Sequence, residues 1–318
     1  MIVSILVPIY NVECYIERCV RSLFEQTYPD IEYIFVDDCS PDHSIDILLR
    51  VLDKYPNRRN QVRIIKHDKN RGLAAARNTA VDNCQSEFLI HVDSDDYLKP
   101  NAVELLVEKQ KESDADIVSG QAILHNKTSL SMMERPQYIN KKDFVADMIK
   151  PSLHHTIWGR LIRTSLYKDN HIQAKEGVNI GEDLQVMSQL SYFANKVESV
   201  WSVIYHYENS NPNSYMNISS QKKMERSLQD TKSMEIVRDF FKSQKEDEFF
   251  DLTEKYLTHY YLDLLHNYAL HNEKDNFNII KSKFLHLKES NRIIRKTIQR
   301  FATNFYAHKY WARLHSES

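Results

Sequence analysis

The stretch Phe88-Leu89-Ile90-His91-Val92-Asp93-Ser94-Asp95-Asp96 joins a short apolar run to a cluster of carboxylates. The apolar run has the length of a buried strand, so residues 88–92 are predicted to form a strand and residues 93–96 the loop after it. Strands of the same kind are predicted over three earlier ranges: 4–9, 31–36 and 62–65. Between these ranges apolar residues recur at three and four positions, which predicts a helix in each interval.

This alternation predicts the fold class. The β-α-β-α-β order indicates an α/β protein with a Rossmann-like, mainly parallel sheet, right-handed crossovers and helices on both faces. Ligands of such sheets collect at the carboxyl ends of the strands. Two acidic clusters, residues 37–42 and 93–96, directly follow predicted strands, so we expect the chemistry at this edge of the sheet.

The composition narrows the class of protein. The chain has 318 residues, and its hydrophobic content of 42% suffices for a sizeable core. Its 42 basic and 44 acidic side chains nearly balance, which argues against a protein built around nucleic-acid binding. No apolar run approaches the about 18 residues of a transmembrane helix, and the first residues lack the basic flank of a signal peptide. We therefore expect a cytoplasmic protein.

Cysteine and glycine exclude several kinds of site. The four cysteines form no C-x-x-C pair, which argues against a zinc site and favours a reducing compartment. The five glycines fit neither the G-x-G-x-x-G pattern nor the P-loop pattern. A dinucleotide-binding Rossmann site and a P-loop are therefore excluded.

The distribution of helix breakers predicts the domain boundary. Glycine does not occur after Gly181, and Pro212 is the only proline after Pro151. We therefore expect a catalytic domain over residues 1–215 and an α-helical C-terminal region over residues 216–318.

The segment 292–313 near the C-terminus is basic and aromatic. It contains six lysines and arginines and no acidic residue, interleaved with apolar side chains. Such a pattern fits peripheral contact with the inner face of an anionic membrane. It fits equally well a helix that packs on the catalytic domain and exposes its basic face.

Each acidic cluster has two interpretations. The carboxylates of residues 93–96 repel one another unless a cation compensates, which suits a divalent metal on a diphosphate. The alternative is an acidic turn that caps the next helix. Asp37 and Asp38 offer acceptors for a base N–H or a ribose hydroxyl, or they close the strand in an Asx-turn.

Three further features also have two interpretations. Asn70-Arg71-Gly72, with Arg77 behind it, suits the neighbourhood of a nucleotide, although surface ion pairs explain the arginines as well. Glu182-Asp183 opens a predicted helix, where acidic residues are favoured without function, yet a carboxylate there also suits a general base. His206 is either a metal ligand or a partly buried histidine.

Together these segments resemble glycosyltransferase family 2. The likeness covers about residues 2–215 and implies a GT-A fold, the fold of nucleotide-diphospho-sugar transferases. Residues 1–120 would bind the nucleotide sugar, and residues 121–215 would form the acceptor side. The matching segments, in this order and spacing, are Val7-Pro8-Ile9-Tyr10-Asn11, Val36-Asp37-Asp38-Cys39-Ser40-Pro41-Asp42, Asn70-Arg71-Gly72-Leu73 with Ala76-Arg77-Asn78, Val92-Asp93-Ser94-Asp95-Asp96, Ile157-Trp158-Gly159-Arg160-Leu161 and Gly181-Glu182-Asp183.

The resemblance implies which residues contact the nucleotide sugar. Pro8 and Tyr10 would border the nucleotide, and Asp38, together with Asp37, would hold the base. Cys39 departs from the family, which usually has glycine at this position. The other predicted contacts are Asn70, Arg71, Gly72, Arg77, Asp93 on the ribose side, and Ser94.

The resemblance also implies the metal site and the base. Asp95 and His206 would hold Mn²⁺ or Mg²⁺ on the diphosphate, and Asp183 would be the catalytic base of an inverting displacement. The signature Q-x-x-R-W of processive synthases is absent, so we expect a single addition. The implied function is transfer of a hexose from a UDP-sugar or another nucleotide sugar to a hydroxyl of a glycan or lipid-linked sugar, in bacterial cell-surface polysaccharide or glycolipid synthesis.

Two alternatives differ from this function. A sugar-1-phosphate nucleotidyltransferase is disfavoured, because its glycine-rich loop after the first strand is missing. A catalytically inactive GT-A-fold protein that binds or scaffolds is the second alternative. Against it, every acidic residue that the mechanism needs is present.

Overall fold

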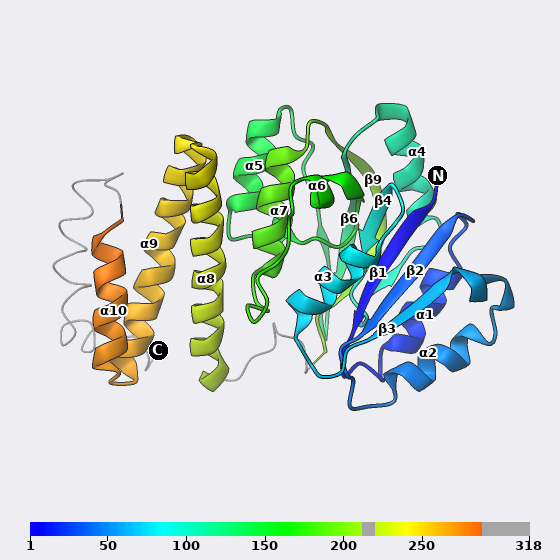
Figure 1. Cartoon of the computed structure of the whole chain (residues 1–318), viewed down its shortest axis with the longest axis horizontal. Helices are drawn as coiled ribbons and strands as arrows, with labels where there is room; N and C mark the ends of the chain where they lie inside the picture. The colour runs from blue at the N-terminus through cyan, green and yellow to red at the C-terminus, as the bar shows by residue number, and fades with distance from the viewer. Residues whose placement is uncertain (212–219, 288–318) are drawn as a thin grey trace. The chain divides into compact units, whose positions relative to one another are not determined.

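The structure is a computed structural model that describes residues 1–211 and 220–287 (Figure 1). The chain divides into two compact units, residues 1–148 with 152–217 and residues 149–151 with 218–318. The boundary expected from the sequence, between residues 215 and 216, falls outside the described ranges and stays a prediction.

The first unit begins with a regular alternation of strands and helices. Strands β3, β2, β1 and β4 lie side by side in this order and are all parallel. Each of these strands begins and ends within one residue of its predicted range. The elements are β1 (Val3–Ile9), α1 (Ile16–Phe24), β2 (Ile31–Asp37), α2 (Ser44–Leu52), the 3₁₀ helix η1 (Pro56–Gln61), β3 (Val62–Lys66), α3 (Leu73–Asn83) and β4 (Phe88–His91).

The sheet continues beyond β4 with strands of mixed direction. Next to β4 lies β8, which is antiparallel to both β4 and β6, whereas β6 and β9 are parallel. The mainly parallel sheet that the sequence predicts is therefore limited to the part before residue 92. No single crossover helix joins β4 to β8, so the rule that makes βαβ strands parallel does not apply to them. The strands, in spatial order, are β8 (Arg160–Arg163), β6 (Ile117–His125), β9 (Val197–Glu208) and β5 (Tyr97–Leu98), with β7 (Leu130–Met133) paired to β6.

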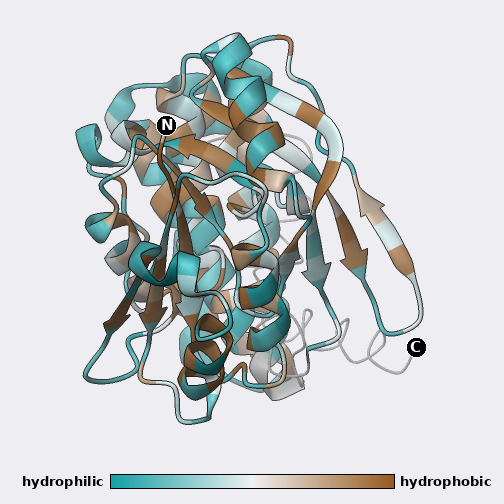
Figure 2. Ribbon diagram, turned by 90° about the vertical axis from the view of Figure 1, so that its right-hand side faces the viewer, coloured by the Kyte–Doolittle hydropathy of each residue, from teal (hydrophilic) through white to brown (hydrophobic). Residues whose placement is uncertain are grey.

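Two apolar cores cover the opposite faces of the sheet. Along the buried strand β1, Val3, Ile5 and Val7 face the first core and Leu6 faces the second, as the two-residue period of a strand requires. Figure 2 shows the strands largely in the colour of hydrophobic residues. The first core includes α1, α2 and α4 (Ala102–Ser113), and the second includes α3, α5 (Lys141–Ile149), α6 (Thr164–Asp169) and α7 (Glu182–Phe193).

Residues 220–287 of the second unit form α8 (Ser220–Gln244), α9 (Asp247–Leu270) and α10 (Lys274–Leu285). Polar contacts join the three helices: the carboxylate of Glu235 accepts hydrogen bonds from Tyr261 Oη at 2.6 Å and from Lys283 Nζ at 2.8 Å. This part agrees with the predicted helical C-terminal region, and the basic segment 292–313 lies outside the described residues. Within the described ranges, no helix combines the length and the apolar character needed to cross a membrane.

Gly120 in β6 and Ile204 in β9 make a contact that requires glycine. A Cβ atom at residue 120 would lie 2.3 Å from Ile204 Cγ1. We expect Gly120→Ala to lower the free energy of unfolding by about 1–3 kcal/mol, the usual cost of overpacking a core. In an Ile204→Ala background the same change should cost less, because the space is free. Urea unfolding of the four proteins measures this, and equal costs in both backgrounds would contradict the clash.

Candidate active site

The carboxyl ends of β1, β2 and β4 bring the predicted site residues to one edge of the sheet. Ile9 of β1 pairs with Asp37 of β2, and the backbone N–H of Asp38 donates to the carbonyl of Ile9 at 3.0 Å. Pro8 is buried inside β1, whereas the side chain of Tyr10 just beyond it is 45% exposed. Tyr10 therefore offers an exposed aromatic ring directly after β1.

The carboxylate of Asp38 is buried and accepts three hydrogen bonds. Its Oδ1 accepts from the backbone N–H of Arg71 at 2.8 Å and lies 2.6 Å from Nδ1 of His67. Its Oδ2 accepts from the backbone N–H of Gly72 at 2.7 Å. A carboxylate has about four lone-pair sites, so one remains for a ligand.

Asp37 and Cys39 shape the turn after β2. The Oδ1 atom of Asp37 accepts from the backbone N–H of Ser40 at 2.8 Å, which is the Asx-turn considered above. Cys39 adopts a left-handed backbone conformation with φ of 58°. Glycine adopts this conformation without strain, so the cysteine keeps a backbone geometry for which the family usually uses glycine.

The segment 70–72 lies between β3 and α3. Gly72 has φ of 89°, and a Cβ atom there would lie 2.4 Å from Asn179 Nδ2, so only glycine fits. Asn70 is exposed. The exposed guanidinium of Arg71 pairs with Glu176 at 2.6 Å, which is the surface ion pair considered above.

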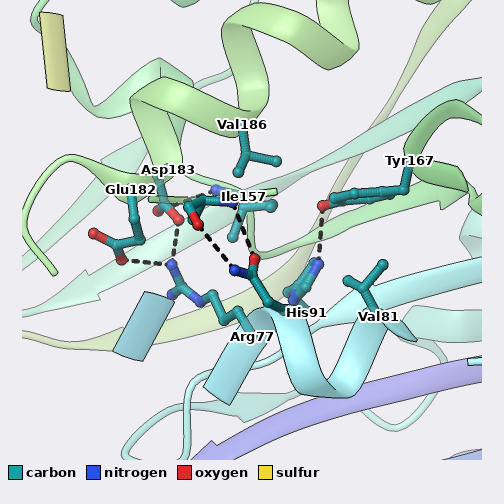
Figure 3. A pocket seen from close by; sticks show the side chains of 10 residues that line it. Arg77, Val81, His91, Ile157, Tyr167, Glu182, Asp183 and Val186 are labelled. Atoms are coloured by element: carbon teal, nitrogen blue, oxygen red, sulfur yellow. Dashed lines mark hydrogen bonds and ion pairs between the residues drawn. The ribbon is translucent and has the colours of Figure 1, made fainter. Parts of the chain in front are cut away.

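Arg77 is the central contact of the site. From α3 its buried guanidinium reaches Asp93 Oδ1 at 2.7 Å. It also reaches Glu182 Oε1 at 2.6 Å and the carboxylate of Asp183 (Figure 3). Asp93 follows β4, whereas Glu182 and Asp183 open α7, about a hundred residues later in the chain. A single cation thus brings together the predicted ribose contact and the predicted base.

Burial sets the protonation of this cluster. Burial raises the pKa of Asp183, and the guanidinium of Arg77 partly offsets this increase. The pKa of Glu182 is raised by burial as well, with the same offset from Arg77 and a further increase from the charge of Asp183. A raised pKa makes Asp183 a stronger base than an exposed aspartate, as proton removal from a hydroxyl requires.

A loop before β8 holds the second oxygen of Asp183. The backbone N–H of Ile157 donates to Asp183 Oδ2 at 3.2 Å. Two buried arginines bind the carbonyls around it: Arg135 donates to Trp158 and Gly159, both at 2.7 Å, and Arg160 donates to Thr156 at 3.0 Å. The sequence analysis missed Arg135 and treated Arg160 only as part of a segment, since neither has a spacing that indicates its role.

A small cavity lies under the Arg77 cluster. Its lining includes Arg77, Glu182 and Asp183. Figure 3 shows His91 and Tyr167 on its far wall, where His91 Nε2 and Tyr167 Oη are 3.0 Å apart. Burial, followed by the charge of Arg77, lowers the pKa of His91 far below its ordinary value, so this imidazole is neutral.

The three aspartates of the 93–96 loop differ in their surroundings. Asp96 is fully buried and accepts from Tyr205 Oη and from the backbone N–H of Glu208, both at 2.7 Å, so its contacts are structural. Ser94, which lies between Asp93 and Asp95 in the sequence, is buried. Asp95 Oδ2 accepts from Asn211 Nδ2 at 2.8 Å. The pKa of Asp95 is raised to about 6, mainly by burial and to a smaller extent by the negative charge of Asp93.

His206 lies in a group of aromatic rings. Its ring stacks on Tyr97 with centroids 4.3 Å apart, and its Nδ1 lies 2.8 Å from His125 Nε2. Burial and the neighbouring His125 lower the pKa of His206 to about 4, so the ring is neutral at pH 7, as a metal ligand must be. Among the described residues no group of three or more His, Cys, Asp or Glu side chains is placed to hold a metal ion. Asp95 and His206 nevertheless offer a carboxylate oxygen and an imidazole nitrogen, which are donor atoms that suit a divalent cation.

Comparisons with known proteins identify the family. Glycosyl transferase family 2 matches residues 4–170. The uncharacterized glycosyltransferase EpsJ of Bacillus subtilis (strain 168) is 30% identical over 236 residues, which are 72% of this chain and 67% of EpsJ. The poly(ribitol-phosphate) beta-glucosyltransferase of Bacillus spizizenii is 34% identical over 210 residues, 65% of this chain and 32% of that protein. The chain therefore belongs to glycosyl transferase family 2.

Solved structures identify the fold. The crystal structure of S. aureus TarS superimposes with a TM-score of 0.70 at 19% identity, over 98% of this chain and 54% of TarS. The mannosyltransferase PcManGT of Pyrobaculum calidifontis, in complex with GDP-Man and Mn²⁺, gives a TM-score of 0.52 at 15% identity, over 99% of this chain and 88% of that one. The predicted GT-A fold with C-terminal helices is confirmed.

The buried Arg77 and the exposed Arg71 give a matched test of the central contact. We expect Arg77→Met to lower the free energy of unfolding by about 3–5 kcal/mol, because it leaves buried carboxylates without their cation. Arg71→Met breaks an exposed pair and should cost less than about 1 kcal/mol. Urea unfolding at pH 7 measures both, and equal losses would contradict a central role for Arg77.

Proposed function

We propose that this chain is an inverting, metal-dependent, non-processive glycosyltransferase that uses a nucleotide sugar, with UDP as the nucleotide. The observation that carries the proposal is the position of Asp183. Its carboxylate is held by Arg77 and the Ile157 N–H, and Arg77 also holds Asp93 at the carboxyl end of β4. The proposed base is thereby fixed beside the carboxyl ends of the strands, where open α/β sheets bind their ligands.

The donor half of the site supports a nucleotide. Asp38 has one lone-pair site left for a base N–H. The exposed ring of Tyr10, directly after β1, would border the nucleotide. Asp93 would contact the ribose, and the loop 70–72 would lie against the nucleotide. A TarS structure in complex with UDP-GlcNAc, with a TM-score of 0.59 to this chain at 20% identity, supports UDP as the nucleotide.

The reaction would be a single displacement. The acceptor hydroxyl gives its proton to Asp183 while its oxygen bonds to the anomeric carbon. The bond between that carbon and the diphosphate oxygen breaks on the opposite side, and the nucleoside diphosphate leaves with the electron pair. This sequence inverts the anomeric configuration. Asp95 and His206 would hold a Mn²⁺ or Mg²⁺ ion, which supplies positive charge to the leaving diphosphate.

The acceptor would be a hydroxyl of a glycan or lipid-linked sugar in cell-surface polysaccharide or glycolipid synthesis. The poly(ribitol-phosphate) beta-glucosyltransferase among the relatives supports a cell-surface polymer as the acceptor class. A cytoplasmic location, with membrane contact through residues 292–313, belongs to this proposal and depends on residues outside the described ranges.

Asp183 and Glu182 provide a matched test of the base, since both bind Arg77 Nη1. Asp183→Asn should lower kcat by about 10²–10⁴-fold, the contribution of general base catalysis, while UDP binding stays unchanged. Glu182→Gln should lower kcat far less. The wild-type rate should rise with pH, because only ionised Asp183 accepts a proton. Burial places this rise above the pH range of an ordinary aspartate. Similar losses in both variants would refute the base assignment.

Calorimetric titration tests the donor and the metal together. We expect UDP to bind more tightly with Mn²⁺ than without it, and Asp95→Ala to remove that difference. GDP and dTDP are the comparison nucleotides. If no nucleoside diphosphate binds with or without Mn²⁺, the inactive scaffold protein becomes the better description.

A further inference from the structure

His67 lies directly behind the carboxylate of Asp38. It follows the last residue of β3, and its backbone N–H donates to the carbonyl of Asp37 at 2.8 Å. The side chain is 6% exposed, and both ring nitrogens have partners. Nδ1 lies 2.6 Å from Asp38 Oδ1, and Nε2 lies 2.9 Å from Thr79 Oγ1 in α3. The ring thus bridges the end of β2 and the helix after the 70–72 loop.

The chemistry of the two partners fixes the proton on the ring. An ionised carboxylate only accepts hydrogen bonds, so Nδ1 of His67 carries a proton and donates it to Asp38. The hydroxyl of Thr79 can donate to Nε2 or accept from it, and this contact holds the ring plane in place. His67 therefore acts on Asp38 as a fixed donor.

The donors around Asp38 determine which lone pair stays open. Two of them, Nδ1 of His67 and the Arg71 N–H, bind Oδ1, and the Gly72 N–H binds Oδ2. The open site thus belongs to Oδ2. Without the His67 donor, Oδ1 would gain an open site, and the carboxylate would be free to rotate between its remaining partners.

We propose that His67 is a positioning residue for recognition of the nucleotide base. It holds the carboxylate of Asp38 in one orientation, so that Oδ2 is the acceptor that faces the base. This inference rests on the proposed function, in which Asp38 holds the base. A fixed, acceptor-only carboxylate selects bases with a ring N–H at the contacted edge, such as uracil. It rejects cytosine, whose ring nitrogen at the same place is itself an acceptor.

The test compares UDP with CDP, because these differ at this edge of the base. Calorimetry should show the wild type binding UDP about tenfold or more tightly than CDP, the effect of one charge-assisted hydrogen bond. Two variants separate the ring nitrogens. The amide of His67→Asn can place an N–H where Nδ1 lies, whereas the longer His67→Gln places its amide near Thr79.

We expect His67→Gln to reduce the preference for UDP over CDP towards one, and His67→Asn to retain most of it. Thermal unfolding of both variants monitors the fold. If His67→Gln does not fold, Thr79→Val, which removes the contact at Nε2, should reduce the same preference. An unchanged preference in His67→Gln, or equal losses in both His67 variants, overturns the positioning role. A wild type that binds UDP and CDP equally overturns the base contact of Asp38 and the inference with it.

Discussion

The rest of the site depends on one buried guanidinium. Arg77 balances Asp93 from the loop after β4 and Glu182 and Asp183 from the start of α7, which belong to distant parts of the chain. Removing an ion from water costs several kcal/mol, and the carboxylates repel one another as well. Only a shared cation makes this arrangement stable. The same contact thereby joins the carboxyl end of β4 to Asp183, to which the proposed function assigns the role of base.

Other carboxylates of the same edge are compensated by neutral donors. Asp38 is surrounded by two backbone N–H groups and an imidazole, and Asp96 by a tyrosine hydroxyl and a backbone N–H. Asp95 accepts a hydrogen bond from the side-chain amide of Asn211, while burial and the charge of Asp93 raise its pKa to about 6. A cation at Asp95, the residue to which the proposed function assigns the metal, would remove the repulsion between Asp95 and Asp93.

The sequence predicted those features that depend on local order. Strands β1–β4 and the loops at their carboxyl ends follow from periodicity over short windows, and the parallel arrangement follows from the helices between them. The pairing of Arg77 with Glu182 joins residues 105 positions apart, and no local pattern indicates it. The antiparallel β8 and the buried Arg135 and Arg160 were missed for the same reason. His67 was missed as well, because only the register of β2 and β3 in the structure, which pairs Asp37 with Lys66, brings the next residues Asp38 and His67 together.

The charge balance also distinguishes the two adjacent carboxylates at the start of α7. Both Glu182 and Asp183 bind Arg77 Nη1, and burial raises the pKa of each. Two carboxylates that share one cation cannot both ionise without repulsion, so a proton on Glu182 leaves Asp183 charged and basic. The backbone N–H of Ile157 donates to Asp183 and favours the charged form of that carboxylate. Arg135 and Arg160 hold this loop in place by binding the neighbouring carbonyls. The two acidic residues thereby differ in charge although they are neighbours in the sequence, which is the difference that the proposed role of Asp183 as base requires.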